Sequence, residues 1–418
     1  GGCVWEMGDH AVLHVDSNGF THYTYGGDHG EWIHDGNFCV DGIFYPDRKP
    51  STGAWIVRHV YRPLRFSWLG GSPGSSEGSR FEVFNTTGFT LGKDFRVAVS
   101  VDSGPSFDVF VDAPPLGRSG ICLDLPSDAR LVKFDTYDGR GVLVGTDQIE
   151  VSKPVLPESE SIEAAAVEVP SFIGEASTIL FRAATDNDKP WFRPNPMKKW
   201  YSQREEVFGR KVVGNGCKVI MSNIMAAGNR FLCVDEYRRC KTKAGFDGSV
   251  YVRALLHPVS AHGRLPRFGK SFKLDSSFDA VRWFGREKES YVDMKEQSPI
   301  GEYSGRVCDM TEPNIRPQES GNRCDTQWVE LENDGLIVRF DAVNEPFNLG
   351  IKPYSDLELT KMKHREDEVR TGTYVTLSAF HQGIGTGSCG PYTLKEHMYS
   401  AKKDYELCFV VSWKTKRR

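Results

Sequence analysis

The residues best able to do chemistry in this chain gather in one loop near its start. Residues 25–50, YGGDHGEWIHDGNFCVDGIFYPDRKP, alternate glycines, aromatic rings and acids without the periodicity of a helix or a strand. Turns and side-chain hydrogen bonds must therefore hold this backbone. Aromatic rings stack on the flat faces of sugars, and acids and amides bind sugar hydroxyls, so the loop is typical of a carbohydrate site.

Four side chains of this loop could also bind a cation. His34, Asp35, Asn37 and Asp41 form a dense run of polar ligands, mostly oxygens, of the kind that holds an alkali or alkaline-earth ion. A network of Asx turns that caps the loop explains the same pattern equally well. The spacing leaves both interpretations open.

The carboxylates near the start invite a search for a catalytic pair. They are Glu6, Asp9, Asp28, Glu31 and Asp35. Glycoside hydrolysis needs two carboxyl groups on opposite sides of one bond, and spacing in the sequence cannot identify such a pair. Taken alone, these residues predict sugar binding and no more.

A second glycine-rich segment, GIGTGSCGP at residues 383–391, imitates a dinucleotide-binding fingerprint. Pro391 lies inside the helix that this motif needs, and too little chain follows for a βαβ unit. The segment is therefore expected to be a tight loop that presents Ser388 and Cys389. Cys389 has no identifiable histidine partner, which favours a thiol that lines a site or is structural over a nucleophile.

The composition excludes several classes of function. Lys and Arg number 52 against 56 Asp and Glu, and no basic stripe interleaves with aromatic residues, so nucleic acid is not expected as a partner. No apolar run is long enough to span a membrane. The ten cysteines are scattered and no zinc or P-loop motif occurs, which favours a reduced, cytoplasmic protein.

The first sixty residues predict little regular structure. Residues 1–7 read as a buried strand that has no partner in the chain, so we expect the chain to be a piece of a longer protein. Residues 11–15 and 20–25 flank a turn signal and predict a hairpin. Residues 52–61 fit a helix and a strand about equally well.

The rest of the chain predicts β-structure. Residues 62–153 alternate strictly between apolar and polar residues, which indicates a β-sandwich. Val97 and Val99 alternate with Arg96, and Phe107, Val109 and Val111 are expected to face inward. An acidic, proline-containing linker at 154–169 precedes a larger β-rich unit at 170–418. The only helix predicted there is 355–368. Its candidate strands are residues 211–221, 231–240, 249–256, 328–332, 335–341, 373–380 and 405–412.

Six stretches in order resemble a known family, the glycoside hydrolase family 2 β-galactosidases of the bacterial lactose-operon type. They are GGCVWEMGDH (1–10), the 25–50 loop, FRAATDND (181–188), LPRFG (265–269), NIRPQESGNR (314–323) and SAFHQGIGTGSCGP (378–391). The resemblance covers nearly the whole chain as the C-terminal part of such an enzyme. It implies a mainly β fold with the end of a catalytic (β/α)8 barrel at 1–61. An immunoglobulin-like sandwich and a large galactose-mutarotase-like β-supersandwich would follow.

The resemblance also implies roles for individual residues. Trp5 would be the platform on which the galactosyl ring stacks, and Cys389 would line the site where a well-known member has a tryptophan. Phe38, by its carbonyl, and Asp41, by its carboxylate, would hold a sodium ion that binds the sugar. His34 would lie near a second, outer magnesium ion.

Both catalytic glutamates of the family, and the main magnesium ligands, would lie upstream of this chain. A retaining mechanism needs both carboxyl groups, so the chain alone is expected to be inactive. Its partners would be a β-galactoside such as lactose and the missing N-terminal part, within a homo-oligomer when intact. The alternatives are a small subunit that complements a separate large chain, a family 2 enzyme of other specificity, and residual epimerase activity.

Overall fold

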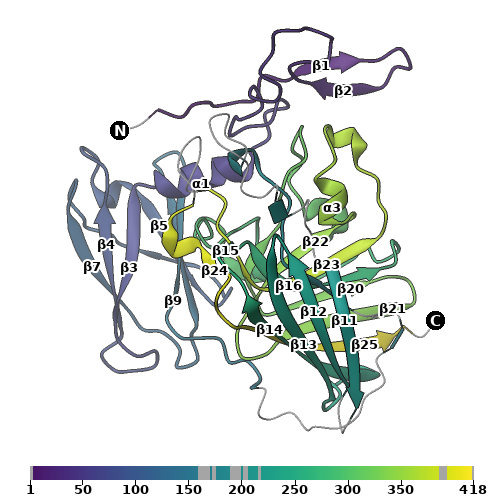
Figure 1. The fold of residues 1–418 in the computed structure, drawn as a ribbon. Helices are drawn as coiled ribbons and strands as arrows, with labels where there is room; N and C mark the ends of the chain where they lie inside the picture. The colour runs from purple at the N-terminus through teal and green to yellow at the C-terminus, as the bar shows by residue number, and fades with distance from the viewer. Residues whose placement is uncertain are drawn as a thin grey trace. The chain divides into compact units, whose positions relative to one another are not determined.

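The computed structural model describes residues 3–158, 170–171, 176–188, 199–200, 206–214, 218–385 and 393–416. The chain is mainly β and divides into two compact units (Figure 1). The small unit comprises Pro50–Val155 with Glu296–Gly301. The large unit comprises Gly1–Lys49, Leu156–Lys295 and Glu302–Arg418.

The small unit is a sandwich of two antiparallel sheets with strand orders β3-β4-β7 and β6-β5-β8-β9. This confirms the sandwich that the alternating sequence predicts. Phe66 stacks on Phe134 across the core with 4.2 Å between ring centroids. The bounds are α1 Thr52–Val60, β3 Leu64–Gly70, β4 Ser79–Asn85, β5 Arg96–Val101, β6 Phe107–Val109, β7 Arg118–Leu123, β8 Leu131–Tyr137 and β9 Leu143–Glu150.

One inward-facing assignment in the small unit is wrong. Val97, Val99 and Val111 are buried as predicted, but Phe107 is exposed. β6 is a strand of only three residues at the edge of its sheet, where a side chain has fewer neighbours to cover it.

The ambiguous segment at residues 52–61 is a helix, α1. The hydroxyl of Ser51 caps it by accepting a hydrogen bond from the amide of Gly53, at 3.1 Å. Arg62, just beyond the helix, donates to the carbonyl of His59 and to the carboxylate of Asp147 on β9. Local periodicity does not distinguish a helix from a strand at residues 52–61, and contacts with a distant strand favour the helix.

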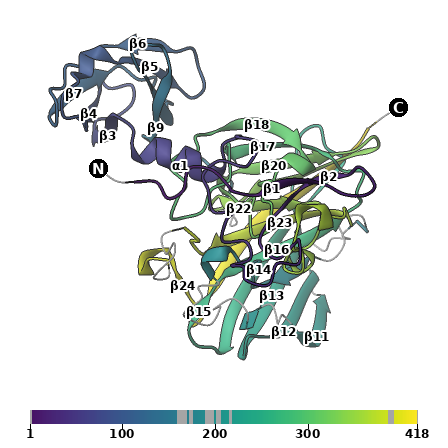
Figure 2. The ribbon, with the colours of Figure 1, turned by 90° about the horizontal axis from the view of Figure 1, so that it is seen from above.

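The large unit contains two sheets that pack face to face. The nine-stranded sheet has the order β11-β12-β13-β14-β25-β21-β20-β17-β18, so that β11 and β18 are its two edges (Figure 2). Its bounds are β11 Glu206–Gly214, β12 Lys218–Ala226, β13 Asn229–Arg239, β14 Gly248–Ser260, β17 Ala280–Arg286, β18 Ile300–Arg306, β20 Trp328–Glu332, β21 Leu336–Ala342 and β25 Tyr405–Thr415.

The second sheet has five strands in the order β10-β16-β23-β22-β19. Phe272 of this sheet meets Phe340 and Phe409 of the larger sheet at ring-centroid distances of 5.0 and 5.9 Å, which places the core between the two. The bounds are β10 Ser177–Ile179, β16 Arg267–Leu274, β19 Arg323–Thr326, β22 Phe347–Lys352 and β23 Thr373–His381. Two short strands, β15 Arg264–Leu265 and β24 Tyr399–Ser400, pair separately.

Six of the seven strands predicted in this unit are confirmed. The seventh, residues 211–221, is wrong as one strand, because it covers the end of β11 and the start of β12, which pair antiparallel with Val212 opposite Ile220. The prediction passed over Asn215-Gly216, a hairpin signal within the alternating run.

The helix predicted at 355–368 is reduced to one turn, α3 Asp356–Leu359, with a separate 3-10 turn at Arg365–Asp367. Ser355 and Glu358 form a capping box that starts α3. The chain then leaves the helical path because the amide of Arg365 donates to the carbonyl of Ile315. A long-range contact therefore overrides the helical pattern.

At the start of the chain, the hairpin is confirmed as β1 Val12–Val15 and β2 Thr21–Thr24, and it projects beyond the sheets of the large unit (Figure 1). Of the buried strand predicted at residues 1–7, the described residues 3–7 do not form a strand. Trp5 and Met7 are exposed, and the carbonyls of Glu6 and Met7 accept hydrogen bonds from the amides of Ile43 and Phe44.

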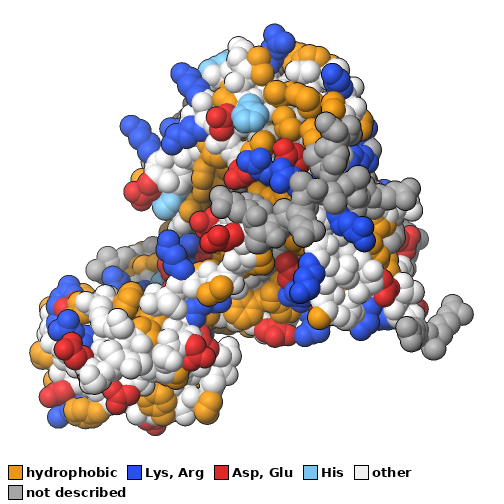
Figure 3. All heavy atoms as spheres, turned by 90° about the horizontal axis from the view of Figure 1, so that it is seen from below, with side chains coloured by type: hydrophobic (Ala, Val, Ile, Leu, Met, Phe, Trp, Pro, Cys, Tyr) orange, Lys and Arg blue, Asp and Glu red, His pale blue; other side chains and the backbone are white. Residues whose placement is uncertain are grey.

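Charged side chains of both signs are interspersed over the face of the molecule drawn in Figure 3. Among the described residues, no helix is both long and apolar enough to cross a membrane.

Candidate functional site

The bridge between Gly8 and Phe44 joins the start of the chain to the end of the 25–50 loop. The amide of Asp9 donates to the carbonyl of Phe44 at 2.9 Å. This contact brings the carboxyl groups of Glu6, Asp9 and Asp41 close enough for their charges to interact. An acidic cluster thus forms from two segments that are separate in the sequence.

The acidic cluster carries surplus negative charge. Burial raises the pKa of Asp9 to about 6, although the amide of Gly42 donates to its Oδ1 at 2.8 Å. Burial also raises the pKa of Asp41, and the carboxyl group of Glu6 raises it further. His10 Nε2 lies 2.6 Å from Glu6 Oε2. A cation beside these groups would relieve their repulsion.

Trp5 and Phe38 present their rings to solvent beside this cluster. Trp5 is 87% exposed and Phe38 is 61% exposed. Within the described residues, no N–H donates to the carbonyl oxygen of Phe38, which lies three residues before Asp41. A carbonyl oxygen and a carboxylate are ligands that hard cations prefer, so the pair fits a sodium ion chemically. No three His, Cys, Asp or Glu side chains of the described residues surround one metal position.

Two of the four possible cation ligands are engaged in other contacts. His34 Nδ1 accepts a hydrogen bond from the amide of Gly36 at 3.1 Å. Asn37 donates from Nδ2 to Asp186 Oδ2 at 2.8 Å, and its Oδ1 accepts from the guanidinium of Arg316. His34 therefore stabilises a turn of the loop, and Asn37 bridges the loop to Asp186 and Arg316.

Two carboxylates of the loop are turn caps. Asp28 Oδ2 accepts from the amide of Tyr25 at 2.8 Å and lies 2.8 Å from His364 Nε2. Glu31 accepts from the amides of Gly27 and His29, and the first of these bonds is the main reason why its pKa is lowered. Capping therefore accounts for Asp28 and Glu31 without a catalytic role.

Besides the contact between Asp28 and His364, three points among the described residues fasten the loop to segments far along the chain. The first is the bridge from Asn37 to Asp186 and Arg316. At the other two, the hydroxyl of Tyr25 donates to the carbonyl of Lys363 at 2.6 Å, and the hydroxyl of Tyr45 donates to Glu312 Oε2 at 2.5 Å. The three points position the 25–50 loop within the large unit.

Behind Asp186 lies a buried network of charges. Arg182 Nη1 lies 2.6 Å from Asp188 Oδ2, and the guanidinium outweighs the effect of burial to hold the pKa of Asp188 below its ordinary value. Glu319 accepts from the amide of Ala183 and from Lys352 Nζ, both at 2.8 Å. These partners fix the segment that contains Asp186.

A second buried group surrounds Glu289. Burial and the nearby carboxyl of Glu312 raise the pKa of Glu289 to about 8, and burial lowers the pKa of Arg323 to about 10. His381 lies in the other network, with its Nε2 3.9 Å from Glu319 Oε1. Its Nδ1 lies 2.8 Å from the carbonyl of Gln382, and burial lowers the pKa of its ring well below the ordinary value. A neutral His381 therefore carries its proton on Nδ1.

Cys389, the remaining predicted site residue, lies outside the described residues. The structure adds two residues that the sequence did not single out, Asp186 and Arg316, which are the partners of Asn37, and it places Glu6 beside Asp41. Asp186 and Arg316 occur in the FRAATDND and NIRPQESGNR stretches. The available signal was that both stretches are rich in polar residues.

The comparisons with known proteins agree with this arrangement. Residues 1–66 match the TIM barrel domain of glycosyl hydrolases family 2, and residues 160–411 match the β-galactosidase small chain. The class is therefore that of the family 2 glycosyl hydrolases. More particularly, the chain belongs to the β-galactosidase small chain family, whose match covers more than half of its residues.

Individual relatives support this assignment. The chain is 26% identical to a β-galactosidase of Staphylococcus xylosus, covering 94% of this chain and 44% of that protein. It is also 26% identical to a β-galactosidase of Actinobacillus pleuropneumoniae, covering 98% and 44%. The chain thus spans less than half the length of these relatives. A solved galactose mutarotase related enzyme from Lactobacillus acidophilus matches 69% of this chain and 97% of its own, at 10% identity with a TM-score of 0.30.

Proposed function

We propose that this chain supplies the galactose-binding side of a retaining β-galactosidase that hydrolyses terminal β-D-galactosides such as lactose. Trp5 stacks on the sugar ring, while Phe38 and Asp41 hold a sodium ion. The sodium ion would then bind the oxygen of a sugar hydroxyl. The two catalytic glutamates and the main magnesium ligands lie outside these residues, and the greater length of the relatives supports this.

The observation that carries the proposal is the bridge made by Asn37. Its contacts with Asp186 and Arg316 fix the loop directly before Phe38 and Asp41. A sugar site needs such fixed ligands, because a displacement of about 1 Å can cost a large factor in rate. The exposed ring of Trp5 supports completion of the site by another protein surface.

One observation favours a second candidate function. The family model that covers residues 160–411 is described as a small chain, which suits a subunit that complements a separate large chain. In the first case the intact enzyme is proposed to be a cytoplasmic homo-oligomer, and in the second a cytoplasmic assembly of the small and large chains.

The test is hydrolysis of a chromogenic β-galactoside in the presence of sodium and magnesium. We expect no activity from the chain alone and activity when it is mixed with the N-terminal portion encoded by its own gene. In that mixture, Trp5→Ala should lower kcat/KM by roughly ten-fold or more, whereas the matched control Trp32→Ala should have little effect.

Hydrolysis by the chain alone would contradict the proposal, and would assign the chemistry to its own carboxylates such as Glu6. Activity on glucuronides or mannosides but not galactosides would contradict the specificity. Activity only with a separately encoded large chain would select the small-subunit alternative.

A further inference from the structure

A cavity of about 570 Å³ lies within the large unit, and the proposed galactose site does not use it. Its walls come from both sheets: β10, β16, β22 and β23 of the smaller sheet, and β11, β12 and β13 of the larger. The volume lies within the range of about 300–1,000 Å³ that is typical of sites for small molecules. The cavity is therefore large enough for a ligand of one or two sugar rings.

Hydroxyl groups are the commonest polar groups of these walls. Six of them belong to Ser177, Thr178, Ser222, Ser271, Tyr374 and Thr376. A hydroxyl can both donate and accept a hydrogen bond, so walls of this kind suit a ligand that is itself rich in hydroxyls. Ile179, Phe181 and Leu357 add apolar surface, which suits the CH faces of a sugar.

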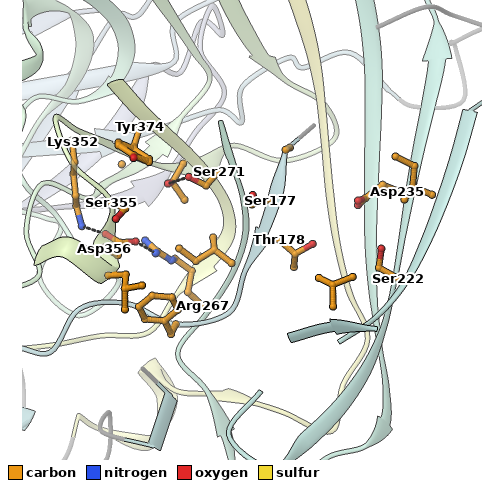
Figure 4. A pocket seen from close by; sticks show the side chains of 18 of the residues that line it. Ser177, Thr178, Ser222, Asp235, Arg267, Ser271, Lys352, Ser355, Asp356 and Tyr374 are labelled. Atoms are coloured by element: carbon orange, nitrogen blue, oxygen red, sulfur yellow. Dashed lines mark hydrogen bonds and ion pairs between the residues drawn. The ribbon is translucent and has the colours of Figure 1, made fainter. Parts of the chain in front are cut away.

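One side of the cavity contains three buried charged groups, shown at close range in Figure 4. Lys352 Nζ lies 2.5 Å from Asp356 Oδ1, and the guanidinium of Arg267 pairs with the other oxygen of Asp356. Burial alone would raise the pKa of Asp356, but these two cations hold it well below its ordinary value. Asp356 is therefore ionised, and the charges at this side are paired.

A second pair of charges lies at the opposite side of the view in Figure 4, where Asp235 and Ser222 are labelled. Lys270 Nζ lies 2.6 Å from Asp235 Oδ2 and 2.8 Å from Thr178 Oγ1. Lys270 has no exposed surface. Ser177 and Thr178 of β10 lie between the two charged groups in the same view.

The burial of two groups of ion pairs in the walls of one cavity has an energetic cost that must be offset. Taking charges out of water costs several kcal/mol per ion, so such pairs seldom stabilise a fold better than apolar residues would. Fixed, paired charges can instead strengthen hydrogen bonds to a ligand that lies between them. Lys352 also pairs with Glu319, so each charge of these two groups has an opposite partner and the groups favour a neutral ligand over an anion or a cation.

We propose that this cavity binds a small neutral saccharide, of one or two rings, at a site separate from the 25–50 loop. Hydroxyls of β10, β12, β16 and β23 bind the sugar hydroxyls, and the Lys352–Asp356–Arg267 group orients one end. The proposal does not depend on the proposed galactosidase function.

Two substitutions can block the cavity in different ways. Ser177 is exposed at the start of β10, so Ser177→Trp places a bulky ring at the cavity without disturbing the core. Ser222→Leu fills the cavity from β12. Ser276→Trp is the matched control, because Ser276 is exposed in a turn and does not line the cavity. Trp5→Ala removes the proposed stacking platform of the other sugar site.

The experiment is titration of the 418-residue chain with galactose, glucose and lactose, followed by calorimetry, with inorganic phosphate as an anionic probe. Thermal melting followed by circular dichroism establishes that each variant is folded. We expect at least one saccharide to bind, and Ser177→Trp and Ser222→Leu each to weaken that binding by about ten-fold or more. Ser276→Trp should leave it unchanged, and Trp5→Ala distinguishes sugar bound at the 25–50 loop from sugar bound in the cavity.

Three results would overturn the inference. They are the absence of binding by all three saccharides, binding that survives both blocking substitutions in folded variants, and binding of phosphate in place of sugar. A loss of binding in Trp5→Ala alone would assign the sugar to the 25–50 loop, which refutes the second site and supports the proposed function.

Discussion

At the scale of single residues, the large unit keeps a carboxyl group in an environment that disfavours its charge. Glu289 is buried and accepts a hydrogen bond from the amide of Gly321 at 3.1 Å. Burial first, and the carboxyl of Glu312 second, raise its pKa from 4.5 to about 8. The folded state therefore keeps a proton on Glu289 over a pH range in which the unfolded state has lost it.

This difference predicts a pH dependence of stability. Between pH 4.5 and about 8 the unfolded chain binds fewer protons at this site than the folded chain, so the free energy of unfolding should fall as the pH rises. The slope from one such group is up to about 1.4 kcal/mol per pH unit. Urea unfolding at several pH values should show that Glu289→Gln removes this contribution.

The matched control for Glu289→Gln is Glu345→Gln, because Glu345 is exposed. It should leave the slope as in the parent chain. Identical slopes for the parent chain and Glu289→Gln would show that Glu289 is ionised in the folded protein.

At the scale of elements, α1 is held to the small unit by a buried ion pair. Arg62 follows the helix, and its Nε lies 2.9 Å from both carboxylate oxygens of Asp147 on β9. In the same unit, Arg96 and Asp108 form a pair at 3.0 Å that is exposed on both sides. The two pairs have similar geometry and differ in burial.

The difference in burial predicts unequal effects of removing each arginine. Arg62→Ala leaves Asp147 buried without its cation, and should cost about 3 kcal/mol of the free energy of unfolding of the small unit. Arg96→Ala, the matched control, should cost less than about 1 kcal/mol, because water and salt screen an exposed pair. Denaturant unfolding of both variants measures this, and equal losses would contradict the argument.

Most strands were predictable from their apolar patterns, whereas the extent of the two helices was not. Strand β13 alternates between buried and less buried residues along most of its length, and β14 and β25 contain long apolar runs, so all three are visible in the sequence. Thr52–Val60 and Asp356–Leu359 are too short for periodicity to decide. Capping by Ser51 and Ser355, together with contacts to distant residues, settles their extent.

At the scale of the whole molecule, the chain contains two separate cores. One includes Phe66, Phe81 and Phe134 of the small unit, and the other includes Phe272 and Phe340 of the large unit. Each core buries its own apolar surface, which is what allows a unit to unfold by itself.

Two cores predict two unfolding transitions in calorimetry. Phe134→Ala and Phe340→Ala each remove a buried ring and should each cost about 3–5 kcal/mol. We expect each substitution to shift a different transition to lower temperature and to leave the other in place. A single transition that both substitutions shift equally would show that the units unfold together.

The candidate site was predictable from the sequence only in part. The loop and its mixture of glycines, aromatic residues and acids are local features of composition, and they occur in one stretch of residues. The partners of the loop are not local: Asn37 meets Asp186 and Arg316 across 149 and 279 positions of the chain. No spacing rule reaches that far, so the contacts that position the site required the structure.

The attachment of the 25–50 loop has a consequence for synthesis on the ribosome. Tyr25 bonds to Lys363, 338 positions later. At about 5–20 residues per second, translation needs roughly 20–70 seconds to produce that partner after Tyr25 has been made. During this interval the exposed aromatic residues of the loop have no final docking surface, so we expect the nascent chain to need chaperones that shield such segments until the last strands emerge.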